Sequence, residues 1–256
     1  MSDETKDVAA ASASEAAPGQ ATTEKVRGVF SKIAPTYDLL NRLISFGTDE
    51  GWRRRTVAMA ELTPDSRVLD LAAGTGDLTL ALARRGHPAE VLSTDFVPEM
   101  LEIARPKAAR YVGSTRIAFQ VEDAQALTLP AGSFDVVTIA FGVRNLPDRA
   151  ANFREVLRVL KPGGRYLILE FTTPPFAPFR WVYHWYIRTF IPFVGGLVSG
   201  ERAAYQYLND SIRLFPPQAA LAEELRDAGF RDVSWRNMTF GVVAVHLAVK
   251  QGPTRV

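Results

Sequence analysis

Apolar residues in this chain fall into short continuous runs separated by stretches with helical spacing. Continuous apolar runs of this length are typical of strands buried on both faces of a parallel sheet. They cover residues 67–71, 90–95, 116–121, 134–140 and 166–171, and helical spacing covers 77–84, 98–110 and 149–160. Strands and helices that alternate in this way predict an α/β fold with helices on both faces of the sheet.

The flanking segments extend this pattern. Residues 24–62 predict an N-terminal helical cap, with short helices around Pro35 and then a basic helix. Near the C-terminus, a helix over 219–228 precedes strands over 232–238 and 242–250, which predict an antiparallel hairpin at the sheet edge. We expect one domain over 24–250, with tails over 1–23 and 251–256. The first tail is predicted to be disordered because it has almost no bulky apolar residue.

An aromatic helical insert over 172–215 interrupts the α/β pattern. The stretch from Phe171 to Phe193 holds nine aromatic residues, with Arg180, His184 and Arg188 among them. One interpretation is a helical pair that packs on the sheet. The other is a lid or membrane-facing surface that receives a long apolar substrate, since Trp, Tyr and Arg favour membrane interfaces.

Composition narrows the chemistry. Cysteine is absent, which excludes disulfides, Cys-zinc sites and thiol nucleophiles, and no residue spacing suggests a metal. The net charge of +2 does not indicate nucleic-acid binding, although it suits weak attraction to an anionic membrane. No apolar run is long enough to span a membrane, so we expect a cytoplasmic protein. Peripheral contact at the inner face of the membrane and a homodimer are both left open.

A glycine-rich turn follows the first predicted strand in the sequence VLDLAAGTGD, and the second strand ends in Asp95. Gly74 and Gly76 would let the backbone approach a ligand, and Asp70 would orient the turn. Asp95 would accept hydrogen bonds from both ribose hydroxyls of a nucleoside cofactor. A dinucleotide site would have a third glycine where this chain has Thr79, so NAD is disfavoured.

Further stretches give the chain a family resemblance. The glycine turn, VEDA, LPAGSFDVVT and LRVLKPGGRYLILE are similar to class I S-adenosylmethionine-dependent methyltransferases. That resemblance implies a Rossmann-like, seven-stranded, mostly parallel sheet with one antiparallel edge strand. More narrowly, the chain resembles the UbiE/MenG family, which methylates ring carbons of isoprenoid quinols in menaquinone and ubiquinone synthesis. The narrower match is carried by APTYDLLNRLISFG, FGVRN, RVLKPGGRYLILEFTTP and YQYLNDSIRLFPPQ.

The resemblance implies contacts with S-adenosylmethionine. By position they fall on Thr75 in the turn, Asp95 at the ribose, and Asp123 with Ala124 at the adenine. An alternative for Asp123 is an N-cap before a short helix at 125–127.

Several positions depart from the family pattern. Asp49 stands at the usual histidine, which casts doubt on a direct catalytic role there, whereas Trp52 keeps its place. Ala140 replaces a serine that contacts the cofactor, so that side-chain hydrogen bond is lost. The remaining departures are Leu40 for methionine, Ala72 for glycine and Thr172 for serine.

The acceptor chemistry requires a stabilised phenolate, because a ring carbon attacks a methyl group most readily when a quinol hydroxyl is ionised. Arg144 follows the fourth strand, where class I enzymes face their acceptor, and we predict that it binds or polarises the quinol oxygen. The alternative for Arg144 is a surface ion pair. Asn41, Phe141 and Asn145 are predicted to contact the prenylated quinol.

The sequence leaves two roles open for each of three polar residues and predicts a structural role for a fourth. Tyr37 is predicted to pack on the methionine part of the cofactor or to relay a proton. Asp38 either serves the site or caps the helix over 39–44. Glu170 is either an acceptor-side base or a buried pairing partner, and His246 is expected to be a core histidine.

The main hypothesis is therefore an enzyme that transfers methyl from S-adenosylmethionine to demethylmenaquinol, giving menaquinol. One alternative is methylation of 2-polyprenyl-6-methoxy-1,4-benzoquinol in ubiquinone biosynthesis. Another is a non-catalytic cofactor- or lipid-binding subunit, which the presence of Arg144, Asp95 and Asp123 disfavours.

Overall fold

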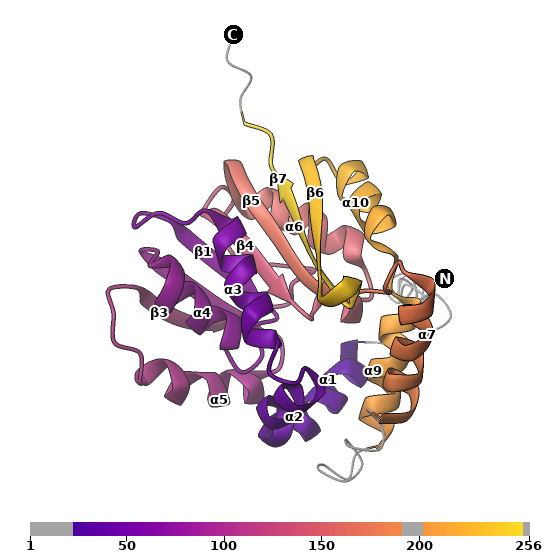
Figure 1. Ribbon diagram of the computed structural model, residues 1–256. Helices are drawn as coiled ribbons and strands as arrows, with labels where there is room; N and C mark the ends of the chain where they lie inside the picture. The colour runs from indigo at the N-terminus through magenta and orange to yellow at the C-terminus, as the bar shows by residue number, and fades with distance from the viewer. Residues whose placement is uncertain (1–22, 191–201, 253–256) are drawn as a thin grey trace, which may run out of the picture.

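A computed structural model describes residues 23–190 and 202–252, which build a central sheet in the strand order β3-β2-β1-β4-β5-β7-β6 (Figure 1). β7 runs antiparallel to both of its neighbours, and the pairs from β3 to β5 are parallel. The predicted seven-stranded, mostly parallel fold is confirmed, and its hairpin places β7 between β5 and the outermost strand β6. The strands are β1 Arg67–Leu71, β2 Glu90–Asp95, β3 Arg116–Val121, β4 Phe134–Ala140, β5 Leu160–Phe171, β6 Arg231–Met238 and β7 Val243–Val249.

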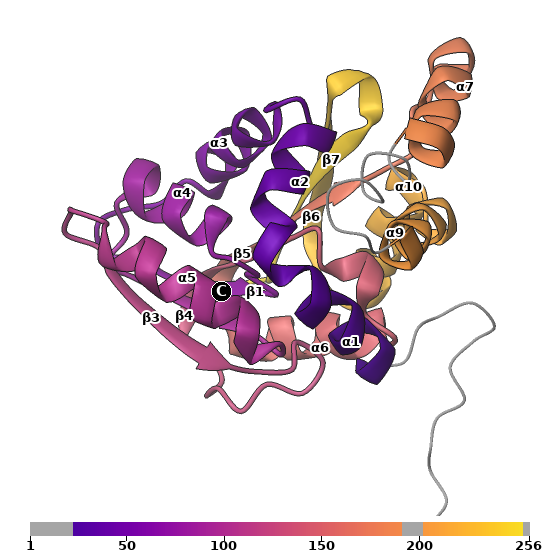
Figure 2. The ribbon, with the colours of Figure 1, turned by 90° about the horizontal axis from the view of Figure 1, so that it is seen from below.

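Helices cover both faces of the sheet, as the sequence predicts (Figure 2). Trp52 of α3 and Leu82 of α4 pack in one core against alternate residues of the strands. Phe153 of α6 and Leu221 of α10 pack in the core on the other face. The helices of the first face are α3 Asp49–Ala60, α4 Asp77–Gly86 and α5 Pro98–Ala109, and those of the second are α6 Arg149–Val159 and α10 Gln218–Asp227.

Two further groups of helices lie beyond the carboxyl ends of the parallel strands (Figure 1). The N-terminal group is α1 Thr23–Ile33, η1 Ala34–Thr36 and α2 Tyr37–Ile44, and the insert contributes α7 Ala177–Trp185, η3 Tyr186–Phe190 and α9 Arg202–Leu214. The Tyr186 hydroxyl donates to the Ile44 carbonyl at 2.7 Å, which joins the two groups. Two short helices lie in connections: η2 Val143–Asn145 follows β4, and η4 Thr239–Gly241 joins β6 to β7. The predicted first tail falls mainly outside the described residues, as does most of the second.

No helix in the described ranges combines the length and apolar character needed to cross a membrane.

His246 is a buried residue of β7 whose Nε2 lies 2.9 Å from the Gln218 carbonyl, as expected of a core histidine. Burial lowers the pKa of this histidine.

The carboxylate of Asp70 joins three elements beneath the sheet edge. It is fully buried and accepts hydrogen bonds from the hydroxyls of Thr79 in α4, at 2.6 Å, and Thr138 in β4, at 2.7 Å. Burial raises the pKa of Asp70 to about 6. The residue that breaks the dinucleotide pattern, Thr79, therefore satisfies a buried acid at the start of the cofactor turn.

We predict that Thr79→Val destabilises the fold mainly above pH 6. Hydrogen bonds to a charged group contribute about 1.5–3 kcal/mol, and Asp70 is ionised only above its raised pKa of about 6. Because the folded pKa exceeds the unfolded one, Asp70 lowers stability as pH rises from its unfolded pKa to its folded pKa of about 6, and the variant, which raises the folded pKa further, extends that loss above pH 6. Urea unfolding at pH 5 and pH 8 measures it, with exposed Thr189→Val as the control. An equal loss at both pH values would contradict the account.

Candidate active site

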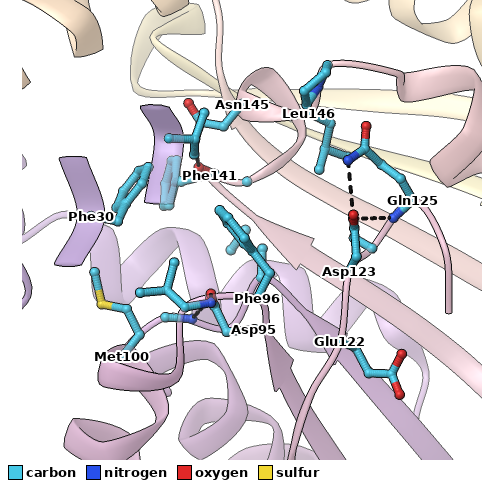
Figure 3. A pocket seen from close by; sticks show the side chains of 18 of the residues that line it. Phe30, Asp95, Phe96, Met100, Glu122, Asp123, Gln125, Phe141, Asn145 and Leu146 are labelled. Atoms are coloured by element: carbon cyan, nitrogen blue, oxygen red, sulfur yellow. Dashed lines mark hydrogen bonds between the residues drawn. The ribbon is translucent and has the colours of Figure 1, made fainter. Parts of the chain in front are cut away.

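A pocket lies at the carboxyl ends of β1, β2 and β4, beneath α1 (Figure 3). Its floor carries one acid, Asp95, and its walls carry the apolar side chains of Phe30, Phe96 and Met100 (Figure 3). The residues predicted from the sequence that line it are Tyr37, Gly74, Asp95, Asp123, Ala124, Phe141 and Asn145.

Asp95 is held by the glycine turn. Its Oδ2 accepts from the Gly74 amide at 2.8 Å, and its Oδ1 accepts from the Val97 amide at 2.9 Å. The Phe96 amide also bonds this carboxylate, which has about four acceptor positions in all, so it keeps capacity to accept a ligand hydroxyl. Burial raises the pKa of Asp95 to about 6, against the opposing effect of the backbone amides.

Three residues predicted at the cofactor do not line the pocket. Asp70 accepts hydrogen bonds from Thr79 and Thr138 below the sheet edge, as described above. Gly76 starts α4 with a positive φ of 81°, and a Cβ there would lie 3.0 Å from the Cβ of Ala104, so close helix packing requires this glycine. Thr75 is buried, and its hydroxyl donates to Asp38 of α2 at 2.5 Å. Thr75 thus ties the N-terminal helices to the turn.

Asp123 and Ala124 form the far wall. Oδ1 of Asp123 accepts from the Gln125 backbone amide at 2.9 Å and from its side-chain amide at 3.1 Å, which fixes a turn (Figure 3). The alternative of an N-cap is wrong, because Ala124 and Gln125 form a turn and no helix follows at residues 125–127. Asn152 donates to the Ala124 carbonyl at 2.8 Å and anchors this wall to α6.

The FGVRN segment packs directly on the glycine turn. Phe141 has a positive φ of 56°, and its carbonyl accepts from Arg144 Nη1 at 2.6 Å and from the Asn145 amide at 3.2 Å. A Cβ on Gly142 would lie only 2.7 Å from the Cβ of Ala72, so glycine is required for this contact. Ala72, which stands at a family glycine, also has a positive φ of 47°. The two motifs therefore form one rigid unit.

Arg144 and Glu170 form an ion pair inside the protein. Arg144 Nη1 donates to Glu170 Oε1 at 2.7 Å, and the two side chains are 4% and 0% exposed. Glu170 also accepts from the Phe171 amide at 2.8 Å and the Arg144 amide at 3.3 Å. Burial raises the pKa of Glu170, and the Arg144 charge opposes the rise. Arg144 is therefore no surface ion pair, and Glu170 has the pairing role that the sequence left open.

The guanidinium of Arg144 retains an unused donor. Its Nε is buried and has no hydrogen-bond partner among the described residues. The charge of Arg144 acts on the phenols of Tyr37, Tyr183 and Tyr207, and Tyr207 donates to Asn145 at 3.0 Å. A buried N–H without an acceptor costs about 1–3 kcal/mol, so an oxygen-bearing ligand would be favoured here.

Tyr37 lies over the glycine turn. Its ring meets the Phe30 ring edge to face, with centroids 6.1 Å apart, and it hydrogen-bonds Asn41. Burial raises the pKa of Tyr37, so at neutral pH the phenol is a donor and cannot serve as a base. Asn41 holds Tyr37 and does not line the pocket.

A second cavity of about 240 Å³ lies behind the aromatic residues Trp52 and Phe171. Phe171 contacts Phe141 of the first pocket, with ring centroids 4.7 Å apart, and Trp52 contacts both rings. The guanidinium carbon of Arg144 lies 5.5 Å from the centre of the Phe171 ring. The Phe141–Phe171 pair thus separates a pocket with polar anchors from an almost wholly apolar cavity.

Sequence reasoning missed several site residues. Phe96 follows Asp95 directly, and Met100 lies about one helical turn after Phe96. Their position just after the end of a strand could have indicated that they line the pocket. Tyr207 lies in the family stretch YQYLNDSIRLFPPQ but carries no local signature. Asp49, which stands where the family usually has histidine, is buried and forms an ion pair with Arg53 at 2.7 Å. This pairing agrees with the prediction that a direct catalytic role for Asp49 is doubtful.

The fold is that of the class I S-adenosylmethionine-dependent methyltransferases. An S-adenosylmethionine-dependent methyltransferase from Thermotoga maritima superposes with a TM-score of 0.62 at 17% identity, covering 88% of this chain and 99% of that one. A sequence profile of the ubiE/COQ5 methyltransferase family matches residues 19–250. The chain belongs to this family.

Two relatives show how close the sequences are. The demethylmenaquinone methyltransferase of Thermus thermophilus is 50% identical over 219 residues, covering 86% of this chain and 98% of the relative. The ubiquinone/menaquinone biosynthesis C-methyltransferase UbiE of Geobacter sulfurreducens is 43% identical over 228 residues, covering 89% of each. The family resemblance inferred from the sequence is confirmed.

We predict that affinity for S-adenosylhomocysteine depends on the ionisation of Asp95. Below its pKa of about 6 the carboxyl is protonated and accepts ribose hydroxyls less well, so affinity should fall by up to about tenfold per pH unit. Above pH 7 the affinity should be constant. Calorimetric titrations between pH 5 and pH 8 measure this dependence. Asp95→Asn should bind weakly without the pH dependence, whereas exposed Asp65→Asn should match the parent. A pH-independent affinity in the parent would contradict the assignment.

Proposed function

We propose that this protein transfers a methyl group from S-adenosylmethionine to a ring carbon of demethylmenaquinol, giving menaquinol in menaquinone biosynthesis. Family membership and the name of the Thermus thermophilus relative support the reaction class and the acceptor ring. Arg144 lines neither cavity, and the observation that carries the site assignment is its buried Nε, which has no partner among the described residues, in a guanidinium that lies against the Phe171 ring.

The residues of the first pocket fit S-adenosylmethionine. Asp95 offers two carboxylate oxygens for the ribose hydroxyls, and the free oxygen of Asp123 offers an acceptor for an adenine amino group. Apolar side chains of Phe96 and Met100 provide walls for the adenine ring. S-adenosylmethionine, when bound, supplies a methyl group on a positively charged sulfur. Ala140 contributes no side-chain hydrogen bond, as the sequence predicts.

The acceptor would lie against Arg144. Its Nε would donate to a quinol oxygen and stabilise the phenolate that makes the ring carbon nucleophilic. Glu170 would hold the guanidinium in place, because both of its oxygens already accept from Arg144 or the backbone. Methyl transfer to the ring carbon would release S-adenosylhomocysteine, and the proton of that ring carbon would then pass to solvent water as the aromatic ring re-forms.

Closure of the site would supply much of the remaining acceleration. Tyr37 lies against the glycine turn, and Tyr207 reaches Asn145 from α9, so the helical segments cover the pocket from two sides. Holding a reacting pair in line can lower a barrier by several kcal/mol. The phenol of Tyr37 would act as a hydrogen-bond donor, given its raised pKa.

The ubiquinone ring remains the second candidate. The Geobacter sulfurreducens relative carries a name that covers both quinones, and its similarity is nearly as great. The acceptor-side residues described above would bind a phenolic oxygen of either ring. Supplying each reduced quinol in turn, with labelled S-adenosylmethionine, distinguishes the two.

We predict that Arg144→Gln lowers kcat for reduced demethylmenaquinone by about 10²–10³-fold, the usual effect of removing one donor to a developing oxyanion. Binding of S-adenosylhomocysteine should stay near the parent value. Arg149→Gln, which breaks the partly exposed pair with Glu224, is the matched control and should keep full activity. Unchanged kcat in Arg144→Gln, with a normal fold by circular dichroism, would contradict the role. Product with the oxidised quinone would contradict the phenolate chemistry.

A further inference from the structure

Helix α7 presents an unusually apolar face to solvent. Phe176, Trp181, Val182 and Trp185 are 66%, 74%, 49% and 56% exposed. Two neighbouring turns add Phe46, which follows α2 and is 73% exposed, and Phe240 of η4, which is 80% exposed. We call these six residues the aromatic rim. Scattered apolar side chains are normal on a surface, but a concentration of this size marks an interaction site.

Contacts between the elements keep the rim together. The Phe240 ring lies 5.2 Å from the Phe179 ring of α7, and the Phe46 ring lies 6.0 Å from the Tyr186 ring of η3. α7 stands at the outside of the molecule beside the turn between β6 and β7 (Figures 1 and 2). The rim is therefore one surface built from three elements.

The rim surrounds the mouth of the apolar cavity. Phe46, Val182 and Trp185 belong to both the exposed rim and the cavity lining, whereas Trp52 and Phe171 line its inner end. The inner end contacts Phe141 of the first pocket, as described above. An apolar path thus leads from the outer surface to the wall of the proposed acceptor site.

The segment that carries most of the rim has charge of one sign. The sequence from Phe171 to Gly200 contains no acidic residue, and Arg180 and Arg188 are both exposed in α7 and η3. Exposed aromatic residues interleaved with arginine suit the interface of an anionic bilayer, where each nearby Arg adds electrostatic attraction. A protein partner would more often be matched by acidic and basic groups together.

We propose that the aromatic rim docks on an anionic lipid bilayer and sets the cavity mouth against the acyl chains, so that a prenyl tail enters the cavity from the membrane. The route for the tail rests on the proposed function, since a prenylated quinol is dissolved in the bilayer. The affinity of the rim for lipid follows from its exposure and charge alone.

Co-sedimentation of the full chain with vesicles tests the docking. The protein should bind vesicles of phosphatidylcholine and phosphatidylglycerol in equal parts, and more weakly vesicles of phosphatidylcholine alone. Phe176→Ser combined with Trp181→Ser should lower the partition coefficient at least about tenfold, because both side chains would lose buried apolar area. Trp235→Ser removes a tryptophan that is 38% exposed on β6 and should bind like the parent.

The arginines give an independent readout. Arg180→Gln with Arg188→Gln should weaken the binding that depends on phosphatidylglycerol by about 25-fold, at roughly fivefold per charge. Binding to phosphatidylcholine should be unchanged. No binding to either vesicle, or equal binding by the Phe176/Trp181 variant and the parent, would overturn the proposal. A concentration-dependent dimer that the same variant abolishes, without vesicle binding, would show that a second copy covers the rim.

The docking proposal and the proposed function can be tested independently of each other. Methyl transfer by the unaltered protein to a tail-less reduced naphthoquinone in solution tests the reaction without lipid. Vesicle binding without this activity would overturn the proposed function and leave the docking intact. Activity without vesicle binding would do the reverse.

Discussion

The ion pair between Arg144 and Glu170 is the constraint on which the site depends. Removing both charges from water costs several kcal/mol, and the pair repays this through its close contact and the backbone amides that satisfy Glu170. Neither side chain could be buried alone at this position. The pair consequently fixes a cation against the Phe171 ring, which separates the first pocket from the apolar cavity, and the Nε of that cation has no partner among the described residues.

The glycine turn and the FGVRN segment hold that cation at a set distance from the first pocket. Gly142 packs on Ala72 so closely that no side chain fits between them, and the Phe141 carbonyl is held by Arg144 itself. Asp95 is fixed on the other side of the same turn by the Gly74 amide. A displacement of Arg144 would therefore also disturb the carboxylate of Asp95, and such coupling would suit the proposed reaction, which needs two molecules in line.

Much of the fold was predictable because buried parallel strands have continuous apolar runs, and the ends of β2 and β4 agree with those runs. Asp95, Asp123 and Phe141 were found at the pocket because strand ends meet at one edge of such a sheet. The pairing of Arg144 with Glu170, 26 residues apart, was left open because it depends on the adjacency of β4 and β5. The cavity behind Phe171 depends on packing between the insert and α2, which no local pattern reports.

The pKa of a bound acceptor analogue tests the central claim most directly. A naphthol that cannot be methylated, titrated by its absorbance in the presence of S-adenosylhomocysteine, reports the charge beside its oxygen. If Arg144 Nε contacts that oxygen, the naphthol pKa should fall by about 1–3 units on binding to the parent. In Arg144→Gln that fall should disappear. An equal pKa in the parent, the variant and free solution would show that the acceptor oxygen lies elsewhere.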